Sequence, residues 1–548
     1  MEETLFEKPN LTDEEKYLIS PFFTNLDKSV YAFTFLPPEV AGALCSRASR
    51  AKEDLRTVFL KEFVKPFLEL DNDYKKALDS LIKFLHQYPI DVLFANPKAR
   101  DFYIKWLAEY GDDSIAQMAG TWLVYSSLSQ IAIKHFENQR IGLAPIEKST
   151  RYVDFSSKIE NHYRYFVPPE INKMGLKEEY EKVMDEIFDS YLRIFNKTFD
   201  YFKKNYPEEK ELVLKSKAFD ICRLILPLST LSQVAFYGNG QSFEYMINRS
   251  LNHHLEEIRW AGKRAYEELL KIIPSFLRRI EKEESYNYRK YLGERISRTL
   301  DILKEINWQK EDIFIDGSVK LIEYDAEGEN KIIAGLLYPY LREPYQTILE
   351  KIKKLDLKTK EKILDKILHD RRFRWYKVPR AFEFAYLKFE ILLNIGAWRD
   401  LQRHRMQTQI HQIFTIHNGF DLPEEFKEFG EEDSVLELIK KIEDLYRKIA
   451  KNDVLVSQYS VLFCHKVRFI QYQNLRQFFW ETELRTTPQG HPDYRKIEQD
   501  KAKIIQKIYP LISKYLLVDF NEYYFARRGE KEKEERKKEE LKKFLENV

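Results

Sequence analysis

The chain has 548 residues, of which 44% are hydrophobic and 32% are charged, a globular composition with room for two or more domains. Lysine and arginine number 90 against 88 aspartates and glutamates, so a formal charge of +2 gives no global attraction to nucleic acid or to an anionic membrane. We expect neither partner. Cys45, Cys222 and Cys464 are far apart, which excludes a disulfide scaffold and a cysteine-based zinc site and favours a reducing cytoplasm.

Several other classes of protein lack their usual signals. The first ten residues resemble no secretory signal, and no apolar run approaches the roughly 20 residues of a membrane helix. Glycine is scarce, at 17 residues, and neither a dinucleotide-binding G-x-G-x-x-G nor a P-loop occurs. The histidine groups at 253–254, 411 and 417 have no carboxylate or cysteine in helical register, so we predict no metal site.

Hydrophobic periodicity predicts a mixed structure in which helices dominate. Alternating or β-branched segments predict strands, and apolar residues at three- and four-residue intervals predict helices. In chain order we expect strands at 30–36 and 119–129, helices at 179–206 and 242–273, strands at 319–324 and 384–394, and a helix at 494–517. The fold class is therefore α+β. The mixed-charge stretch 529–548 predicts a solvated helical tail.

Four segments of the first half recur in the same order in the second half, which indicates an internal duplication. The first pair begins at Val30 and Val319, and the second pair ends at Arg140 and Arg405. The third pair begins at Arg164 and Gly419, and the fourth ends at Arg249 and Arg485. Identity within each pair is low, so the shared order is the evidence. We predict two related domains, 1–300 and 310–528, followed by the tail 529–548.

A basic cluster follows the apolar, strand-like run that ends near residue 398. Arg403, His404 and Arg405 place two guanidiniums around an imidazole, an arrangement that suits an anion or a polarised planar ring. The alternative is a basic surface patch. Because strand ends commonly deliver functional side chains, we treat the triplet as a candidate site.

A second group of residues suits a phosphate. Ser149, Arg151 and their loop offer a hydroxyl, a guanidinium and backbone N–H donors on one side, although a structural loop would read the same way. Arg223 and Arg249 lie in helix-like apolar surroundings, where arginine also commonly pairs with a carboxylate. Asn474 and Arg476 stand ahead of Arg485 in a segment that we also interpret as helical.

Together these pieces resemble the flavin-dependent thymidylate synthase family. That family carries R-H-R, seven residues, then S-x-R-Y, preceded by a G-H-E-S-like turn and followed by a helix with N-x-R and a further arginine. Here GDDSIAQ resembles the turn, QRIGLAPIEKSTRY the second part of the signature, ICRLILPLS the helix that carries the phosphate-side arginine, and QRHR the first part. The likeness covers most of both halves.

Each half departs from the family pattern in a different place. In the first half the R-H-R position reads Asn138-Gln139-Arg140, the spacer to Ser149 is 8 residues, and N-x-R reads Asn239-Gly240-Gln241. In the second half R-H-R and N-x-R are intact, but Ile413-Phe414-Thr415-Ile416 replaces S-x-R-Y and Gln458 replaces the phosphate-side arginine. The retained motifs are complementary, which suggests nucleotide contacts in one half and flavin contacts in the other.

The resemblance implies a fold, a reaction and a set of contacts. The fold is two mainly antiparallel sheets packed with long helices. The reaction is the FAD-mediated transfer of a one-carbon unit from methylenetetrahydrofolate to dUMP, with NADPH as the reductant. Carried over by position, the nucleotide contacts are Ser149, Arg151 and Arg223, the catalytic arginines near the pyrimidine are Arg249 and Arg485, and the flavin contacts are Ser49, Ser114, Glu383, Arg403, His404, Arg405, Asn474 and Arg476.

The resemblance also leaves alternatives open. Family members resemble homotetramers with shared active sites, so a tandem chain implies a homodimer that mimics the tetramer. The protein could instead be a divergent flavoprotein acting on another pyrimidine nucleotide, or a non-catalytic nucleotide- or flavin-binding scaffold. The turn-rich stretch from Glu483 to Arg495 is either a lid or a helix break caused by Pro488, Gly490 and Pro492.

Overall fold

The computed structural model describes residues 3–69, 73–88, 98, 101, 105, 113–308, 318–526 and 531–546. By its internal contacts the chain divides into two units. Unit 1 contains residues 1–194, 225–311 and 430–462, and unit 2 contains 195–224, 312–429 and 463–548. Each unit therefore includes a helical segment from the other half of the sequence. The contiguous domain boundaries expected from the sequence stay a prediction.

Unit 1 is built on a four-stranded antiparallel sheet in the order β1-β2-β4-β3. Its strands are β1 (Val30–Ala32), β2 (Gly120–Ser129), β3 (Leu143–Glu147) and β4 (Leu231–Asn239). The two central strands are buried along most of their length, and a register shift interrupts their pairing between Tyr125 and Leu128. Helices therefore cover both faces of the centre of this sheet.

The helices of the first 85 residues pack with β1 and β2 around an aromatic-rich core in unit 1. The helices of unit 1 are α1 (Asp13–Ile19), α2 (Pro38–Ala48), α3 (Leu55–Val58), α4 (Lys65–Leu68), α5 (Asp73–Gln87), α8 (Asp113–Met118), α9 (Gln130–Glu137), α10 (Pro169–Lys173), α11 (Lys177–Asn205, whose last turns belong to unit 2), α13 (Gly240–Leu251), α14 (Glu256–Leu269), α15 (Pro274–Leu277), α16 (Glu283–Glu305), α22 (Glu432–Ala450) and α23 (Val454–Ser457).

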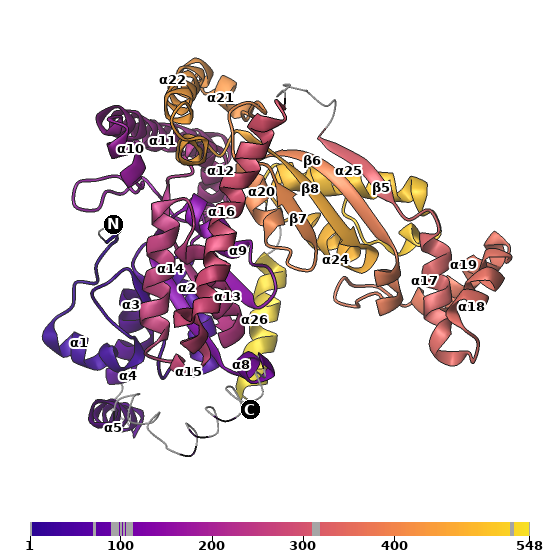
Figure 1. The fold of residues 1–548 in the computed structure, drawn as a ribbon, viewed down its shortest axis with the longest axis horizontal. Coiled ribbons are helices and arrows are strands. Elements are labelled where there is room, and N and C mark those ends of the chain that lie inside the picture. The colour runs from indigo at the N-terminus through magenta and orange to yellow at the C-terminus, as the bar shows by residue number, and fades with distance from the viewer. Residues whose placement is uncertain are drawn as a thin grey trace. The chain divides into compact units, whose positions relative to one another are not determined.

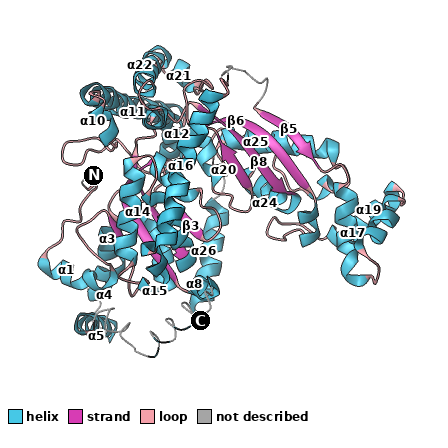
Figure 2. Ribbon diagram, in the orientation of Figure 1, coloured by secondary structure: helices cyan, strands magenta, loops and turns pink. Residues whose placement is uncertain are grey.

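Unit 2 is built on a second four-stranded antiparallel sheet, in the order β5-β6-β8-β7. Figure 2 shows β5, β6 and β8 of this sheet in magenta. Its strands are β5 (Val319–Tyr324), β6 (Tyr386–Asn394), β7 (Thr408–His411) and β8 (Lys466–Asn474). Burial alternates along β6, where Leu387, Phe389 and Ile391 are fully buried and the residues between them are partly exposed. One face of this sheet therefore carries the core of the unit.

The helices of unit 2 include a cluster formed by α17, α18 and α19 at one end of the sheet (Figure 1). The helices of the unit are α12 (Glu211–Cys222), α17 (Gly328–Leu337), α18 (Tyr345–Lys353), α19 (Leu357–Leu368), α20 (Ile395–Gln402), α21 (Glu425–Glu428), α24 (Leu475–Arg485), α25 (Pro492–Ile508) and α26 (Lys531–Glu546). Of these, α26 occupies the stretch for which the sequence predicts a helical tail.

The two sheets have the same strand order when β1–β4 are matched with β5–β8, and their helix starts match as well. The Ser129 hydroxyl accepts the Ala132 N–H and caps α9, and Asn394 accepts the Ala397 N–H and caps α20. Both helices have eight residues. The structure therefore has the architecture of a duplicated unit, and the α+β class with two antiparallel sheets is confirmed.

Most expected elements are present, but several boundaries differ. The helix expected at 242–273 is divided into α13 and α14, and the helix expected at 494–517 ends at Ile508. The segment from Asn474 to Arg485 is helical as predicted, since Asn474 caps α24, but the strand β8 that ends at Asn474 was not predicted. The expected strand ends at Asn394, and α20 separates it from Arg403. The basic triplet is therefore delivered by the end of a helix.

Candidate functional site

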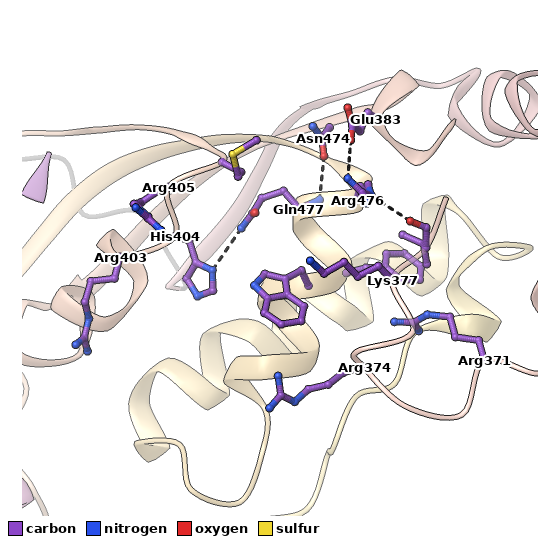
Figure 3. Close-up of a pocket in the computed structure, with 14 residues that line it drawn as sticks. Arg371, Arg374, Lys377, Glu383, Arg403, His404, Arg405, Asn474, Arg476 and Gln477 are labelled. Carbon is purple, nitrogen blue, oxygen red and sulfur yellow. Dashed lines mark hydrogen bonds and ion pairs between the residues drawn. The ribbon is translucent and has the colours of Figure 1, made fainter. Parts of the chain in front are cut away.

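A cavity of about 290 Å³ opens in unit 2 where four segments meet. These are the loop 371–378, the 3-10 turn Arg380–Phe384, the segment 403–406 after α20, and the first turns of α24. All six second-half residues for which the resemblance predicts flavin contacts line it: Glu383, Arg403, His404, Arg405, Asn474 and Arg476. Residues nearly 100 positions apart in the sequence thus converge on one cavity (Figure 3).

The start of α24 sets the floor of this cavity. Asn474 is the last residue of β8, and its side-chain oxygen accepts the Gln477 N–H and caps the helix. The cap fixes the direction of the first turn, which carries Arg476 and Gln477 into the cavity. Arg476 donates to the Val378 carbonyl at 3.1 Å and to the Glu383 carboxylate at 2.9 Å. These bonds hold the guanidinium against the wall formed by the preceding loop.

The wall that faces Arg403, His404 and Arg405 comes from a basic and aromatic loop, residues 371–378, which the sequence did not predict. Figure 3 shows Arg371, Arg374 and Lys377 on the side away from Arg403, His404 and Arg405. Arg371 forms a bidentate ion pair with Glu483, with distances of 2.7 and 2.6 Å, and also donates to the Tyr515 carbonyl. The run RRFRWYK at 371–377 was the available signal, since four of its seven residues are cationic.

Two cations of that loop lie over an aromatic ring of the cavity. The Arg374 guanidinium is 5.6 Å and the Lys377 ammonium 5.4 Å from the centre of the Trp480 ring. Such cation–π contacts leave the polar ends of the two side chains beside the cavity. Six cationic side chains and one carboxylate, Glu383, line the cavity, so its field is positive.

His404 is buried and neutral in this setting. Burial, reinforced by the nearby charges of Arg485, Lys501 and Arg403, holds its pKa well below the ordinary histidine value. The Arg485 Nε–H donates to Nε2 of His404 at 2.7 Å, and a guanidinium can only donate. The proton of the neutral ring is therefore on Nδ1, which lies 3.4 Å from Nε2 of Gln477. Two N–H groups do not bond to each other, so Nδ1 gains an acceptor only when the Gln477 amide turns its oxygen toward the ring.

Arg485 lies behind His404 and does not line the cavity. Besides its bond to His404, it donates to the Asp400 carbonyl at 2.6 Å and lies 5.4 Å from the centre of the Tyr494 ring. The Asp400 carboxylate also pairs with Arg403. Within unit 2 Arg485 thus orients the histidine of the triplet. The contact with a pyrimidine that the resemblance implies for Arg485 stays a prediction.

A buried polar network continues from Gln477 into the core beneath α24. The Glu481 carboxylate accepts from the side-chain amide of Gln471 at 2.9 Å, and Lys501 pairs with Glu498 at 2.8 Å. Glu481, Glu498 and Lys501 are fully buried. Burial raises the pKa of Glu481, while the positive charge of Lys501 opposes that shift. The network fixes the underside of the helix that carries the cavity residues.

The residues predicted to contact a nucleotide lie elsewhere. In unit 1 the Ser149 N–H donates to the Ser49 carbonyl at 2.9 Å, and the Arg151 N–H donates to the Ser149 hydroxyl at 3.2 Å. The structure thus brings Ser49 beside the predicted phosphate loop. Arg223 is a buried residue of unit 2 that follows α12, 3.8 Å from Asp220. Their roles stay predictions.

Arg249 and Ser114 complete the predicted set. Arg249 is in α13 of unit 1, with its guanidinium 5.6 Å from the centre of the Tyr245 ring, and burial lowers its pKa. Ser114 falls in α8, but its side chain lies outside the described residues.

The equivalent helix caps correct one pairing made from the sequence. Asn239 caps α13 as Asn474 caps α24, and the eleventh residue after each is Ser250 and Arg485. The structural counterpart of Arg485 is therefore Ser250 and not Arg249. The contacts of the two residues also match. Ser250 lies within hydrogen-bonding distance of His135, and Arg485 pairs with Asp400, which is the counterpart of His135.

The counterparts of the cavity residues in unit 1 bond to other residues of that unit. Gln139, at the position of His404, donates to the Ser242 carbonyl, and Arg279 pairs with Glu244, which stands where unit 2 has Phe479. Gly142 has a φ of +95°, and a Cβ there would meet the Ser242 hydroxyl at 1.9 Å. Unit 1 thus packs its own chain against this face of α13.

Other kinds of site find no support in the described residues. In the part of the chain that the structure describes, no group of three or more His, Cys, Asp or Glu side chains is arranged to hold a metal ion. Burial raises the pKa of the Cys45 thiol to about 12 and also raises that of Cys222, so neither is poised as a nucleophile. Within the described ranges, each helix is too short or too polar to cross a bilayer.

Comparison with known proteins identifies the family. The family model described as thymidylate synthase complementing protein matches residues 66–275 and 320–511, one stretch in each half of the chain. The chain belongs to the thymidylate synthase complementing protein family. The two matches also support the tandem duplication that the repeated motifs predict, in agreement with the common strand order of the two sheets.

Three relatives match the chain over most of both sequences. A UPF0159 protein of Chlamydia muridarum is 32% identical over 529 residues, covering 94% of this chain and 97% of that protein. A UPF0159 protein of Chlamydia pneumoniae is 32% identical over 97% of this chain and 99% of its own length. UPF0159 protein Ta1429 of Thermoplasma acidophilum is 29% identical, covering 89% and 96%.

One solved structure matches a shorter part of the chain. It is a UMP/dUMP methylase, PolB from Streptomyces cacaoi, bound with 5-Br dUMP. It is 12% identical, with a TM-score of 0.29, and covers 36% of this chain and 93% of its own.

Proposed function

We propose that the protein is a flavin-dependent thymidylate synthase that uses FAD to transfer a one-carbon unit from methylenetetrahydrofolate to dUMP. Membership of the thymidylate synthase complementing protein family supports this reaction class. The single observation that carries the proposal is the convergence of Glu383, the triplet 403–405, Asn474 and Arg476 on one cavity. In the sequence, only the resemblance to the family connects these residues.

The donor set of the cavity fits a flavin nucleotide. Cations on two walls suit a pyrophosphate, since guanidinium groups bind phosphate oxygens through paired hydrogen bonds. Phe479 and Trp480 offer ring faces to a planar aromatic system. Both ring nitrogens of His404 face protein groups, Nε2 toward Arg485 and Nδ1 toward Gln477, so His404 shapes the wall of the cavity and the arginines around it supply the donors to a flavin. When bound, FAD supplies the hydride and one-carbon carrier chemistry that no side chain here provides.

We assign the remaining roles by position. Ser149, Arg151 and Arg223 would hold the nucleotide phosphate, and Arg249 and Arg485 would face the pyrimidine, where a cation stabilises negative charge developing on the ring. NADPH would be the reductant and the cytoplasm the compartment. Two chains would pair as a homodimer and so supply four family modules. These assignments rest on the resemblance and on the family.

The proposal is tested first by the flavin and then by the nucleotide. Purified protein should be yellow, or take up FAD, and should release tritium from dUMP labelled at C5 when methylenetetrahydrofolate and NADPH are supplied. A flavin-bound protein without tritium release would indicate a divergent flavoprotein that acts on another pyrimidine nucleotide. A protein that takes up no flavin would overturn the proposal and leave a non-catalytic scaffold.

Two substitutions separate the two halves of the proposal. Arg405→Ala should weaken FAD retention, because Arg405 lines the cavity of unit 2. Arg151→Ala should weaken dUMP binding and leave FAD bound, because Arg151 is in unit 1. Equal loss of both ligands in both variants would contradict this division of labour.

A further inference from the structure

The loop that forms one wall of the cavity also carries an exposed aromatic pair. Phe373 and Trp375 are 45% and 60% exposed, and their rings stack with centroids 4.5 Å apart at an interplanar angle of 7°. Tyr376, 48% exposed, meets the Phe373 ring edge-on at 5.5 Å. Large aromatic rings that face solvent next to a binding cavity indicate a ligand-contacting surface.

This loop is anchored, so its aromatic pair has a defined position. Arg371 donates to the Tyr376 carbonyl at 2.7 Å and forms the bidentate pair with Glu483, which is fully buried. The Tyr376 N–H donates to the Phe373 carbonyl at 2.9 Å and closes the turn. The flat Phe373–Trp375 stack is thus presented on a turn tied to α24, the same helix that forms the floor of the cavity.

The charge of the loop defines which ligands suit it. Residues 371–380 contain five cationic side chains and no acidic one. Arg372 and Lys377 are exposed, and Arg374 and Lys377 also line the cavity, so the basic surface is continuous from the cavity to the aromatic pair. A base that stacks on an indole and phosphates that pair with guanidinium and ammonium groups would use both features at once.

We propose that the loop 371–377 is a binding subsite for the adenine nucleotide end of a dinucleotide. The purine stacks on the Phe373–Trp375 pair, and its phosphates pair with Arg372, Arg374 and Lys377. This subsite rests on the proposed function, because the flavin cavity supplies the neighbouring end of the ligand. The same chemistry fits two sources, the ADP part of FAD itself and the ADP half of NADPH.

The primary test uses ADP alone as the probe. Binding of ADP to the flavin-free full chain is measured by calorimetry for the wild type, Trp375→Ala, Trp375→Phe and Trp308→Ala. Trp308 is the matched control, since it is 67% exposed and lies in unit 1. Loss of a base–aromatic stack weakens binding by about fivefold or more. We expect that loss in Trp375→Ala, partial recovery in Trp375→Phe and no change in Trp308→Ala.

Three outcomes would overturn the subsite. They are an ADP affinity unchanged in Trp375→Ala, no ADP binding to the wild type, and binding of a single-stranded oligonucleotide at Trp375 without ADP binding. The FAD and FMN affinities of the same variants separate the two sources. Weaker FAD binding with unchanged FMN binding assigns the subsite to the adenine of FAD, and unchanged affinity for both flavins with weaker ADP binding to the FAD-loaded protein assigns it to NADPH.

Failure of the subsite and failure of the proposed function give different results. If the wild type binds neither flavin, the proposed function fails, whatever ADP does. If the wild type binds FAD and Trp375→Ala changes neither flavin affinity nor ADP affinity, the subsite alone fails.

Discussion

Arg485→Met is the substitution that tests most sharply how the basic triplet is held in place. The change removes a guanidinium that donates to His404 at 2.7 Å and to the Asp400 carbonyl at 2.6 Å. Methionine keeps the length of the apolar stem but offers no donor. His404 would then lose the bond that fixes its proton on Nδ1, and the buried ring would be free to change tautomer.

The size of the effect follows from these contacts. A hydrogen bond from a charged donor contributes about 1.5–3 kcal/mol, and the contact with the Tyr494 ring adds about 0.5–1 kcal/mol. The ion pair with the Asp400 carboxylate, at 3.6 Å, adds less than about 1 kcal/mol. Allowing for partial relaxation, we expect Arg485→Met to lower the free energy of unfolding by about 3–5 kcal/mol.

Urea denaturation followed by near-ultraviolet circular dichroism measures this loss. Arg342→Met is the matched control, because Arg342 is an exposed arginine of the same unit and its loss should change the stability by less than about 0.5 kcal/mol. Arg485→Lys keeps the charge without the planar fork and should fall between the two. A loss below about 1 kcal/mol in Arg485→Met would refute the proposed role of Arg485 in orienting His404.

Three further predictions follow from the site and from the family. The folded-state pKa of His404 is depressed, so its neutral form contributes stability above the ordinary histidine pKa of about 6.5, and that stability is lost as the pH falls below this value. His404→Gln should therefore flatten the plot of unfolding free energy against pH between pH 7 and 5. His369→Gln, at an exposed site, should leave this plot unchanged. Arg371→Met leaves the buried Glu483 carboxylate unpaired and should lower the free energy of unfolding in urea by about 3–5 kcal/mol. Replacing both Arg371 and Glu483 with methionine should restore most of that loss. Equal losses in the single and double variants would contradict a stabilising role of this buried ion pair. Sedimentation equilibrium should give twice the mass of the chain, and an obligate monomer would contradict the homodimer.

The sequence predicted the strands and helices whose periodicity is local. The strands at 119–129 and 384–394 show the alternating or continuous burial that their residues indicate. The strand β8 was missed, because Gln471 and Gln473 occupy buried positions, Ile470 and Tyr472 occupy outward ones, and a helix with many aromatic residues follows directly. Periodicity separates a strand from a short buried helix only where flanking turn residues mark its ends.

The cavity was predicted on one side and missed on the other. The triplet 403–405 and the residues around Asn474 match a motif, so their convergence could be expected. Arg371, Arg374 and Lys377 match no motif, and their place depends on a non-local ion pair with Glu483. The sequence also did not predict that 195–224 belongs to unit 2 and 430–462 to unit 1. The periodicity of a segment predicts its secondary structure but not the unit to which it packs.

The stoichiometry of flavin binding tests the central claim most directly. The cavity of unit 2 is lined by the triplet 403–405, whereas in unit 1 Gln139 and Glu244 bond to other parts of the same unit. Titration of the purified chain with FAD, followed by flavin fluorescence, should therefore give one FAD per chain, and Arg476→Met should abolish or strongly weaken that site. Two FAD per chain, or a single site that Arg476→Met leaves unchanged, would contradict the account.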